Sequence, residues 1–146
     1  PKAGGKRKGI LVFTRFLKEA ERLTMSIPGC VIVSGDTPKK ERERILEMFK
    51  VGEIPVVANV GVLTTGFDYP ELDTVVMARP TMSLAMYYQI VGRCIRPHKD
   101  NEAAWFVDLC GNINRFGEVS DLHLKDTGNG KWAVFSRGRQ LTNVRF

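Results

Sequence analysis

Short apolar runs alternate along the chain with stretches whose apolar residues recur at helical spacing. Apolar runs rich in β-branched residues cover residues 10–14, 30–33, 55–59, 74–78 and 104–108. Apolar side chains recur every three or four positions, among charged ones, in residues 16–25, 38–51 and 83–94. Strands that are apolar on both faces are typical of a parallel sheet covered by helices. The pattern therefore predicts an α/β domain with a parallel sheet flanked by helices.

The pattern changes after Gly117. Residues 122–125 and 132–135 alternate between apolar and polar, and the turn residues 127–130 lie between them. This arrangement predicts a short β-hairpin that extends the α/β body, with residues from 136 onward poorly ordered or paired elsewhere. We expect three parts: a basic tail at 1–8, the α/β body at 9–117, and a hairpin and basic tail at 118–146.

Composition narrows the class of protein only slightly. The chain has 146 residues and a net charge of +6, but residues 11–130 carry a net −2, so the basicity lies at the two ends. Such ends fit solvated tails at least as well as nucleic-acid binding. No apolar run approaches the roughly 20 residues of a membrane span, so we expect no contact with a membrane. Three cysteines without a Cys-x-x-Cys pair favour the reducing cytoplasm, and Pro1 at the start indicates a piece of a longer protein.

The polar segment of most interest follows residues 83–88. Gln89, Arg93 and Arg96 recur at helical spacing, and Gly92 lies between the first two. Two planar, permanently charged guanidinium groups beside a glutamine suit a polyphosphate. Arginines that only interact with the C-terminal dipole of their own helix would explain Arg93 alone, but not the whole pattern.

A second polar segment follows the run at 55–59. Its sequence, Asn-Val-Gly-Val-Leu-Thr-Thr-Gly-Phe-Asp, covers residues 59–68. Thr64, Thr65 and the backbone at Gly66 can donate hydrogen bonds to a phosphate, and Asp68 can accept them from sugar hydroxyls. The same residues also form ordinary turns, so this segment alone is a weak signal.

Taken in order, these segments resemble the C-terminal RecA-like lobe of superfamily 2 helicases. Residues 10–14 resemble motif IV, residues 59–68 motif V and residues 89–96 motif VI. The branch that these segments resemble most is the RadD-type, restriction-enzyme-like one, on residues 59–68, 79–83, 89–93, 108–112 and 115–117. Motif V lacks the Thr-Asp start of the DEAD-box branch. The resemblance implies a RecA-like fold over about residues 9–117.

The resemblance also implies site residues. Arg93 and Arg96 would be catalytic and would reach the γ-phosphate of ATP held by another lobe, with Arg96 as the arginine finger. Gln89, Gly66 and Asp68 would lie at the nucleotide. The sugar-phosphate backbone of a single DNA or RNA strand would lie against Thr14, Arg15, Ser34, Gly35, Thr64 and Thr65.

The sequence lacks the parts that hold most of the nucleotide. It has no G-x-x-x-x-G-K-[ST] segment to cradle phosphates and no Asp-Glu pair to hold Mg²⁺. We therefore expect ATP and Mg²⁺ to be held mainly by an N-terminal Walker-containing lobe as partner, without which the chain is inactive. The alternatives are a stand-alone nucleic-acid-binding or protein-docking module with the same fold and, less favoured, a small-molecule binder.

Overall fold

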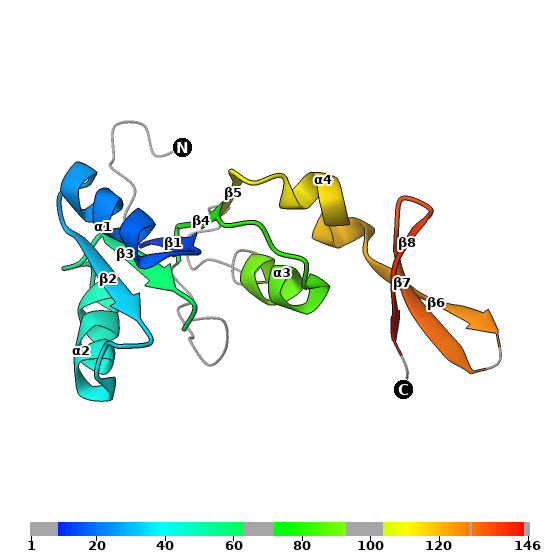
Figure 1. The fold of residues 1–146 in the computed structure, drawn as a ribbon, viewed down its shortest axis with the longest axis horizontal. Coiled ribbons are helices and arrows are strands. Elements are labelled where there is room, and N and C mark those ends of the chain that lie inside the picture. The colour runs from blue at the N-terminus through cyan, green and yellow to red at the C-terminus, as the bar shows by residue number, and fades with distance from the viewer. Residues whose placement is uncertain (1–8, 63–71, 93–103, 129, 145–146) are drawn as a thin grey trace.

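The computed structural model describes residues 9–62, 72–92, 104–128 and 130–144. Within them the chain forms a five-stranded sheet with helices and a separate three-stranded sheet (Figure 1). The first part comprises β1 (Ile10–Thr14), α1 (Leu17–Ser26), β2 (Cys30–Ser34), α2 (Lys39–Lys50), β3 (Val56–Val60), β4 (Thr74–Ala78), α3 (Leu84–Val91) and β5 (Trp105–Asp108). It is followed by α4 (Asn112–Phe116), a 3-10 turn (Val119–Asp121), β6 (His123–Gly128), β7 (Lys131–Ser136) and β8 (Arg139–Val144).

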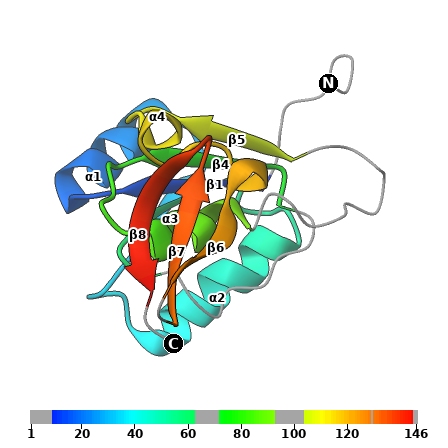
Figure 2. The same ribbon diagram turned by 90° about the vertical axis from the view of Figure 1, so that its right-hand side faces the viewer.

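The large sheet is parallel throughout, with the strand order β2-β3-β1-β4-β5. The chain moves from β1 outward to β2 and then back toward β3, β4 and β5. Because such crossovers are right-handed, α1 must cover one face of the sheet, and α2 and α3 the other. Figure 2 shows this arrangement, with α1 and α4 on one side of the strands and α2 and α3 on the opposite side. The predicted α/β fold with a parallel sheet flanked by helices is confirmed.

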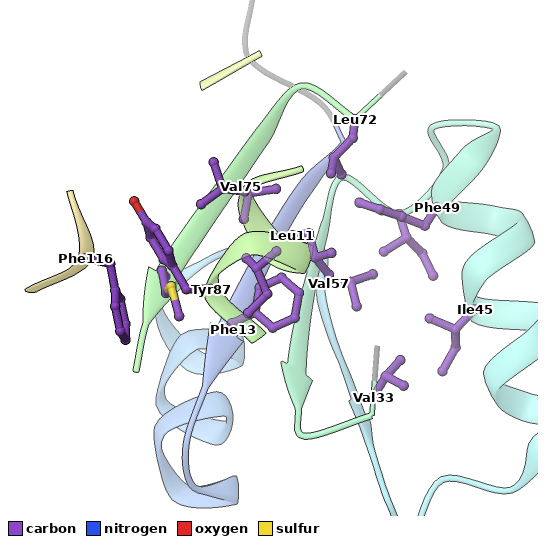
Figure 3. Packing of buried hydrophobic residues seen from close by; sticks show 14 residues of the cluster. Leu11, Phe13, Val33, Ile45, Phe49, Val57, Leu72, Val75, Tyr87 and Phe116 are labelled. Carbon is purple, nitrogen blue, oxygen red and sulfur yellow. The ribbon is translucent and has the colours of Figure 1, made fainter. Parts of the chain in front are cut away.

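The main core lies between the sheet and the helices α2 and α3. Alternate residues of the central strands, such as Leu11, Phe13 and Val57, point toward these helices and are buried (Figure 3). They meet Ile45 and Phe49 of α2 and, further along the sheet, the aromatic and aliphatic residues of α3. The intervening strand residues face α1, which contributes the buried Ala20.

The small sheet differs from the predicted hairpin. Of the two outcomes expected for the residues from 136 onward, the structure shows pairing: residues 139–144 form β8, which pairs antiparallel with β7, so the extension has the strand order β6-β7-β8. The turn between β7 and β8 explains why the chain reverses and adds a third strand. Arg137 and Gly138 both have positive φ, which matches the backbone twist of a tight hairpin.

Two groups of aromatic residues test the sequence pattern. Helical spacing buries one of two neighbouring residues and exposes the other, and in α3 Tyr87 is buried and Tyr88 is exposed. The apolar run at 104–108 implied a strand buried on both faces, but 51% of Trp105 is exposed. The prediction was wrong because β5 is an edge strand and Trp105 is its first residue.

Candidate functional site

The carboxyl ends of the five parallel strands lie along one edge of the large sheet. Thr14 at the end of β1 is in register with Val60 and Ala78, which end β3 and β4. Ser34 at the end of β2 is also in register with Val60. The segments that follow these strands, which carry the predicted site residues, therefore begin side by side. Ligands of open parallel sheets bind at such an edge.

The two residues predicted after β1 present different groups at this edge. Thr14 is buried, and its hydroxyl donates to the carbonyl of Asn59 at 3.4 Å, so this hydroxyl is turned away from solvent. Arg15 is exposed, and its guanidinium carbon lies 5.0 Å from the centre of the Phe16 ring. The backbone N–H groups of both Arg15 and Phe16 donate to a carboxylate oxygen of Glu19, which fixes this turn. The exposed guanidinium of Arg15 is thus a positive charge at this edge of the sheet.

The segment after β2 is a tight turn. The backbone N–H of Ser34 donates to the Thr37 hydroxyl at 3.0 Å, and the Thr37 N–H donates back to the Ser34 carbonyl. Gly35, inside the turn, is exposed, and a Cβ built on it would have no atom within 4 Å. The backbone at Gly35 is therefore open to a ligand.

Asn59 controls the start of the segment after β3. It is fully buried, and its side-chain oxygen accepts from the backbone N–H of Val62 at 3.2 Å. This bond turns the chain away from β3 toward the predicted phosphate-binding residues. Those residues, Thr64, Thr65, Gly66 and Asp68, lie outside the described part of the chain.

A network that the sequence reasoning missed joins the ends of β4 and β5. One oxygen of Asp108 accepts from the Asn112 side chain at 2.8 Å, and the other accepts from the Ile113 N–H at 2.8 Å. Asn112 is fully buried, donates to the carbonyl of Arg79 at 3.1 Å and accepts from the N–H of Thr81 at 2.9 Å. Asp108 thus orients Asn112, which holds the segment after β4. The signal was present as Asp-Leu-Cys-Gly-Asn at 108–112, which the resemblance included without a role.

This network sets where α3 begins. The Thr81 hydroxyl accepts from the Ser83 N–H, and the Ser83 hydroxyl caps α3 by accepting from the Met86 N–H at 3.2 Å. Arg115 of α4 donates to the Thr81 carbonyl at 2.6 Å. The N-terminus of α3 is therefore attached by side chains to β5 and α4.

Tyr87 fixes the other side of α3. Its hydroxyl donates to the Gly117 carbonyl at 2.8 Å, and its ring stacks on Phe116 with centres 5.2 Å apart. Burial, and then the nearby charges of Asp108 and Glu118, raise the pKa of Tyr87 to about 12. The Tyr87 hydroxyl therefore stays protonated and donating at all physiological pH values.

The last turn of α3 carries the first residues of the predicted polyphosphate pattern. Gln89 is exposed, and Gly92 ends the helix. A Cβ on Gly92 would lie 3.0 Å from the Tyr88 carbonyl, so the helix end itself favours glycine there. Arg93 and Arg96 lie outside the described part of the chain. They come directly after α3 in the sequence, so the structure fixes the helix that precedes them.

The part of the chain that the structure describes contains no cluster of three or more histidine, cysteine or carboxylate side chains that could hold a metal ion. No helix in those same residues has both the length and the apolar character that crossing a bilayer requires. Gln89 lies in the last turn of α3 and not at a strand end. At the edge itself the donors are the Arg15 guanidinium and the open backbone at Gly35, which are cationic or neutral. Such a donor set fits anionic phosphates.

The sequence and the fold both match known proteins. The profile of the helicase conserved C-terminal domain matches residues 4–98. The putative ATP-dependent helicase IRC3 of Saccharomyces cerevisiae is 37% identical over 79 residues, which is 54% of this chain and 12% of that protein. The DNA 3'-5' translocase XPB2 of Sulfurisphaera tokodaii is 35% identical over 100 residues, 67% of this chain and 22% of that protein.

Relatives also include the ATP-dependent RNA helicase DBP3 of Gibberella zeae, 33% identical over 105 residues, 69% of this chain and 18% of that protein. Among solved structures, the C-terminal domain of the DEAD-box protein Dbp5 has a TM-score of 0.58 at 24% identity, covering 75% of this chain and 67% of that one. The chain spans only about an eighth to a fifth of the length of these curated relatives.

Proposed function

The chain belongs to the helicase conserved C-terminal domain family of superfamily 2 helicases, and we propose that it is the C-terminal motor lobe of an ATP-dependent nucleic-acid helicase or translocase. The observation that supports this most is the alignment of strand ends. The register of all four strand pairings brings the carboxyl ends of the five strands to one edge. Thr14 and Ser34 end two of these strands, and Arg15 and Gly35 follow them directly. A motor lobe needs such an edge to face both a nucleotide and a nucleic-acid strand.

The catalytic contribution comes from the segment that α3 introduces. Arg93 and Arg96 hold positive charge where phosphoryl transfer accumulates negative charge, and Arg96 is the arginine finger. A finger of this kind is worth roughly 10³–10⁵ in rate. Gln89, Gly66 and Asp68 contact the nucleotide. The Asp108–Asn112 network serves this role indirectly, because it fixes the start of the helix that leads to the arginines.

ATP, when bound between two such lobes, supplies the free energy that drives the motor. We assign Mg²⁺ to the partner lobe with the Walker motifs, because this sequence has no Asp-Glu pair to hold it. This chain by itself does not hydrolyse ATP.

The contacts to a nucleic-acid strand come from the carboxyl ends of β1 and β2 and from the segment after β3. Arg15 offers its guanidinium, Ser34 and Gly35 offer the open turn, and Thr64 and Thr65 offer hydroxyls and backbone N–H groups. Thr14 contributes through its position only, since its hydroxyl is bonded within the sheet. Contacts of this kind position a strand without reading its sequence, so they serve DNA or RNA.

The test is ATP hydrolysis by the chain alone and by the polypeptide in which it is joined to its Walker-containing lobe. We expect no turnover by the chain alone, and turnover stimulated by single-stranded nucleic acid in the joined protein. If the coding sequence upstream encodes no such lobe, or if the joined protein hydrolyses ATP no faster than the upstream lobe alone, the chain is a stand-alone binding module instead.

A further inference from the structure

The small sheet carries much of the positive charge of this protein. Residues 122–146 contain five basic side chains and one acidic one, a net +4, whereas residues 9–121 carry a net −2. Figure 1 shows this sheet at one end of the molecule, beyond α3 and α4. A basic surface added to a near-neutral body attracts polyanions to that end of the molecule.

The two faces of the small sheet differ in chemistry. Residues paired across antiparallel strands share a face, so Leu124 and Val134 lie on one face and His123 and Phe135 on the other. Leu124 and Val134 border a hollow of about 740 Å³ against α3, so theirs is the inner face. His123, Lys125, Lys131 and Phe135 therefore define the outer face, although His123, at the start of β6, also borders the hollow.

The outer face combines stacked rings with unpaired lysines. The rings of His123 and Phe135 are 6.1 Å apart at an interplanar angle of 23°, and His123 is exposed. The ammonium of Lys125 lies 5.7 Å from the centre of the Phe135 ring. Lys125 and Lys131 are exposed, and neither forms an ion pair with a residue that the structure describes. By contrast, Arg137 is paired with Glu118 and Asp121.

We propose that the outer face of the β6-β7-β8 sheet binds single-stranded nucleic acid, with Lys125 and Lys131 at phosphates and a base stacked on the His123–Phe135 pair. Aromatic platforms flanked by basic residues bind single strands in this way, with little sequence preference. The proposal rests on the proposed function, and it gives the motor lobe a second contact with the strand outside the strand-end edge.

The experiment is fluorescence anisotropy with the 146-residue chain. The probes are labelled oligo-dT and oligo-U of about 20 nucleotides, longer than the roughly 4–16 nucleotides such sites occupy. Loss of two phosphate contacts in the K125Q/K131Q variant should weaken binding about 25-fold near 0.1 M salt and reduce the salt slope by about 1.4. The F135L variant, which keeps an apolar side chain, should weaken binding by at least about 5-fold through lost stacking.

The matched control is K39Q/K40Q, which removes the same charge from an exposed turn of α2 and should leave the affinity within about 2-fold. Thermal unfolding of each variant shows that the fold is retained. A 5-iodouracil oligonucleotide should crosslink to the peptide that contains Phe135. The inference is overturned if K39Q/K40Q weakens binding as much as K125Q/K131Q, if polyglutamate competes as well as oligo-dT, or if the wild-type chain does not bind.

The R15Q variant separates this inference from the proposed function. Weaker binding in R15Q but not in K125Q/K131Q would show that the nucleic acid binds only at the carboxyl edge of the large sheet. That result refutes the outer-face site and supports the motor lobe. Weaker binding in K125Q/K131Q but not in R15Q would support the outer-face site and refute the edge contact.

Discussion

Asn112 should be the most consequential polar residue in the described part of the chain. It is fully buried, and its side chain makes three hydrogen bonds: to the Arg79 carbonyl, from the Thr81 N–H, and to the carboxylate of Asp108. Asn112→Ala removes all three. It leaves the Thr81 N–H without an acceptor and releases the segment that precedes α3.

The cost follows from the kinds of bond that are lost. A hydrogen bond between neutral groups contributes about 1 kcal/mol, and one to a charged group about 1.5–3 kcal/mol. Two of the first kind and one of the second give a loss of roughly 3.5–5 kcal/mol in the free energy of unfolding. Asn114 provides the matched control, because it lies on the same helix, is exposed and has no such partners in the described residues.

Urea unfolding monitored by tryptophan fluorescence measures this cost. Trp105 starts β5, which ends in the network, so its emission reports on the affected region. Asn114→Ala should change the free energy of unfolding by less than about 0.5 kcal/mol. A loss below about 1 kcal/mol in Asn112→Ala, or an equal loss in Asn114→Ala, would refute the idea that this network holds α3.

Three further outcomes follow from the same region. Tyr87→Phe should cost about 1 kcal/mol by removing the bond to the Gly117 carbonyl while keeping the stack on Phe116; Tyr88→Phe, at an exposed site, should cost almost nothing in the same urea assay. Because the pKa of Tyr87 is raised to about 12 in the folded protein, its contribution is complete below the unfolded pKa of about 10 and is lost as the pH rises toward 12. Stability measured across that range should fall in the wild type more than in Tyr87→Phe, and equal slopes would contradict the assignment. Gly117→Ala should cost at least about 2 kcal/mol more than Gly138→Ala, since both glycines have positive φ but only at Gly117 would a Cβ overlap the Ser136 hydroxyl. Equal melting temperatures of the two variants would show that the small sheet does not pack as described.

The sequence predicted the large sheet well because each of its strands is a local signal. Residues 10–14 and 74–78 are apolar on both faces, and strands of that kind can only be buried between helices. The prediction for Trp105 failed because periodicity does not reveal which strand lies at the edge. Strand order depends on contacts between distant residues, which no local pattern encodes.

The site shows the same division. The exposed turn at Gly35 and the exposed position of Gln89 on α3 follow from the local sequence pattern. The burial of the Thr14 hydroxyl and the bridge made by Asn112 did not follow, since both join segments far apart in the sequence. The pairing of residues 139–144 with β7 was not predicted, because these residues lack the alternation typical of a strand and the turn at Arg137 and Gly138 directs their pairing.

The central claim is that the arginines after α3 act on a triphosphate held by another lobe. The most direct measurement is kcat for ATP hydrolysis by the protein joined to its Walker-containing lobe, with saturating ATP and single-stranded nucleic acid. Arg96→Gln should lower kcat by roughly 10³-fold or more, and Arg93→Gln should also lower it. Arg22→Gln, at an exposed position on α1, should leave kcat unchanged. A kcat for Arg96→Gln equal to that of Arg22→Gln would contradict the claim.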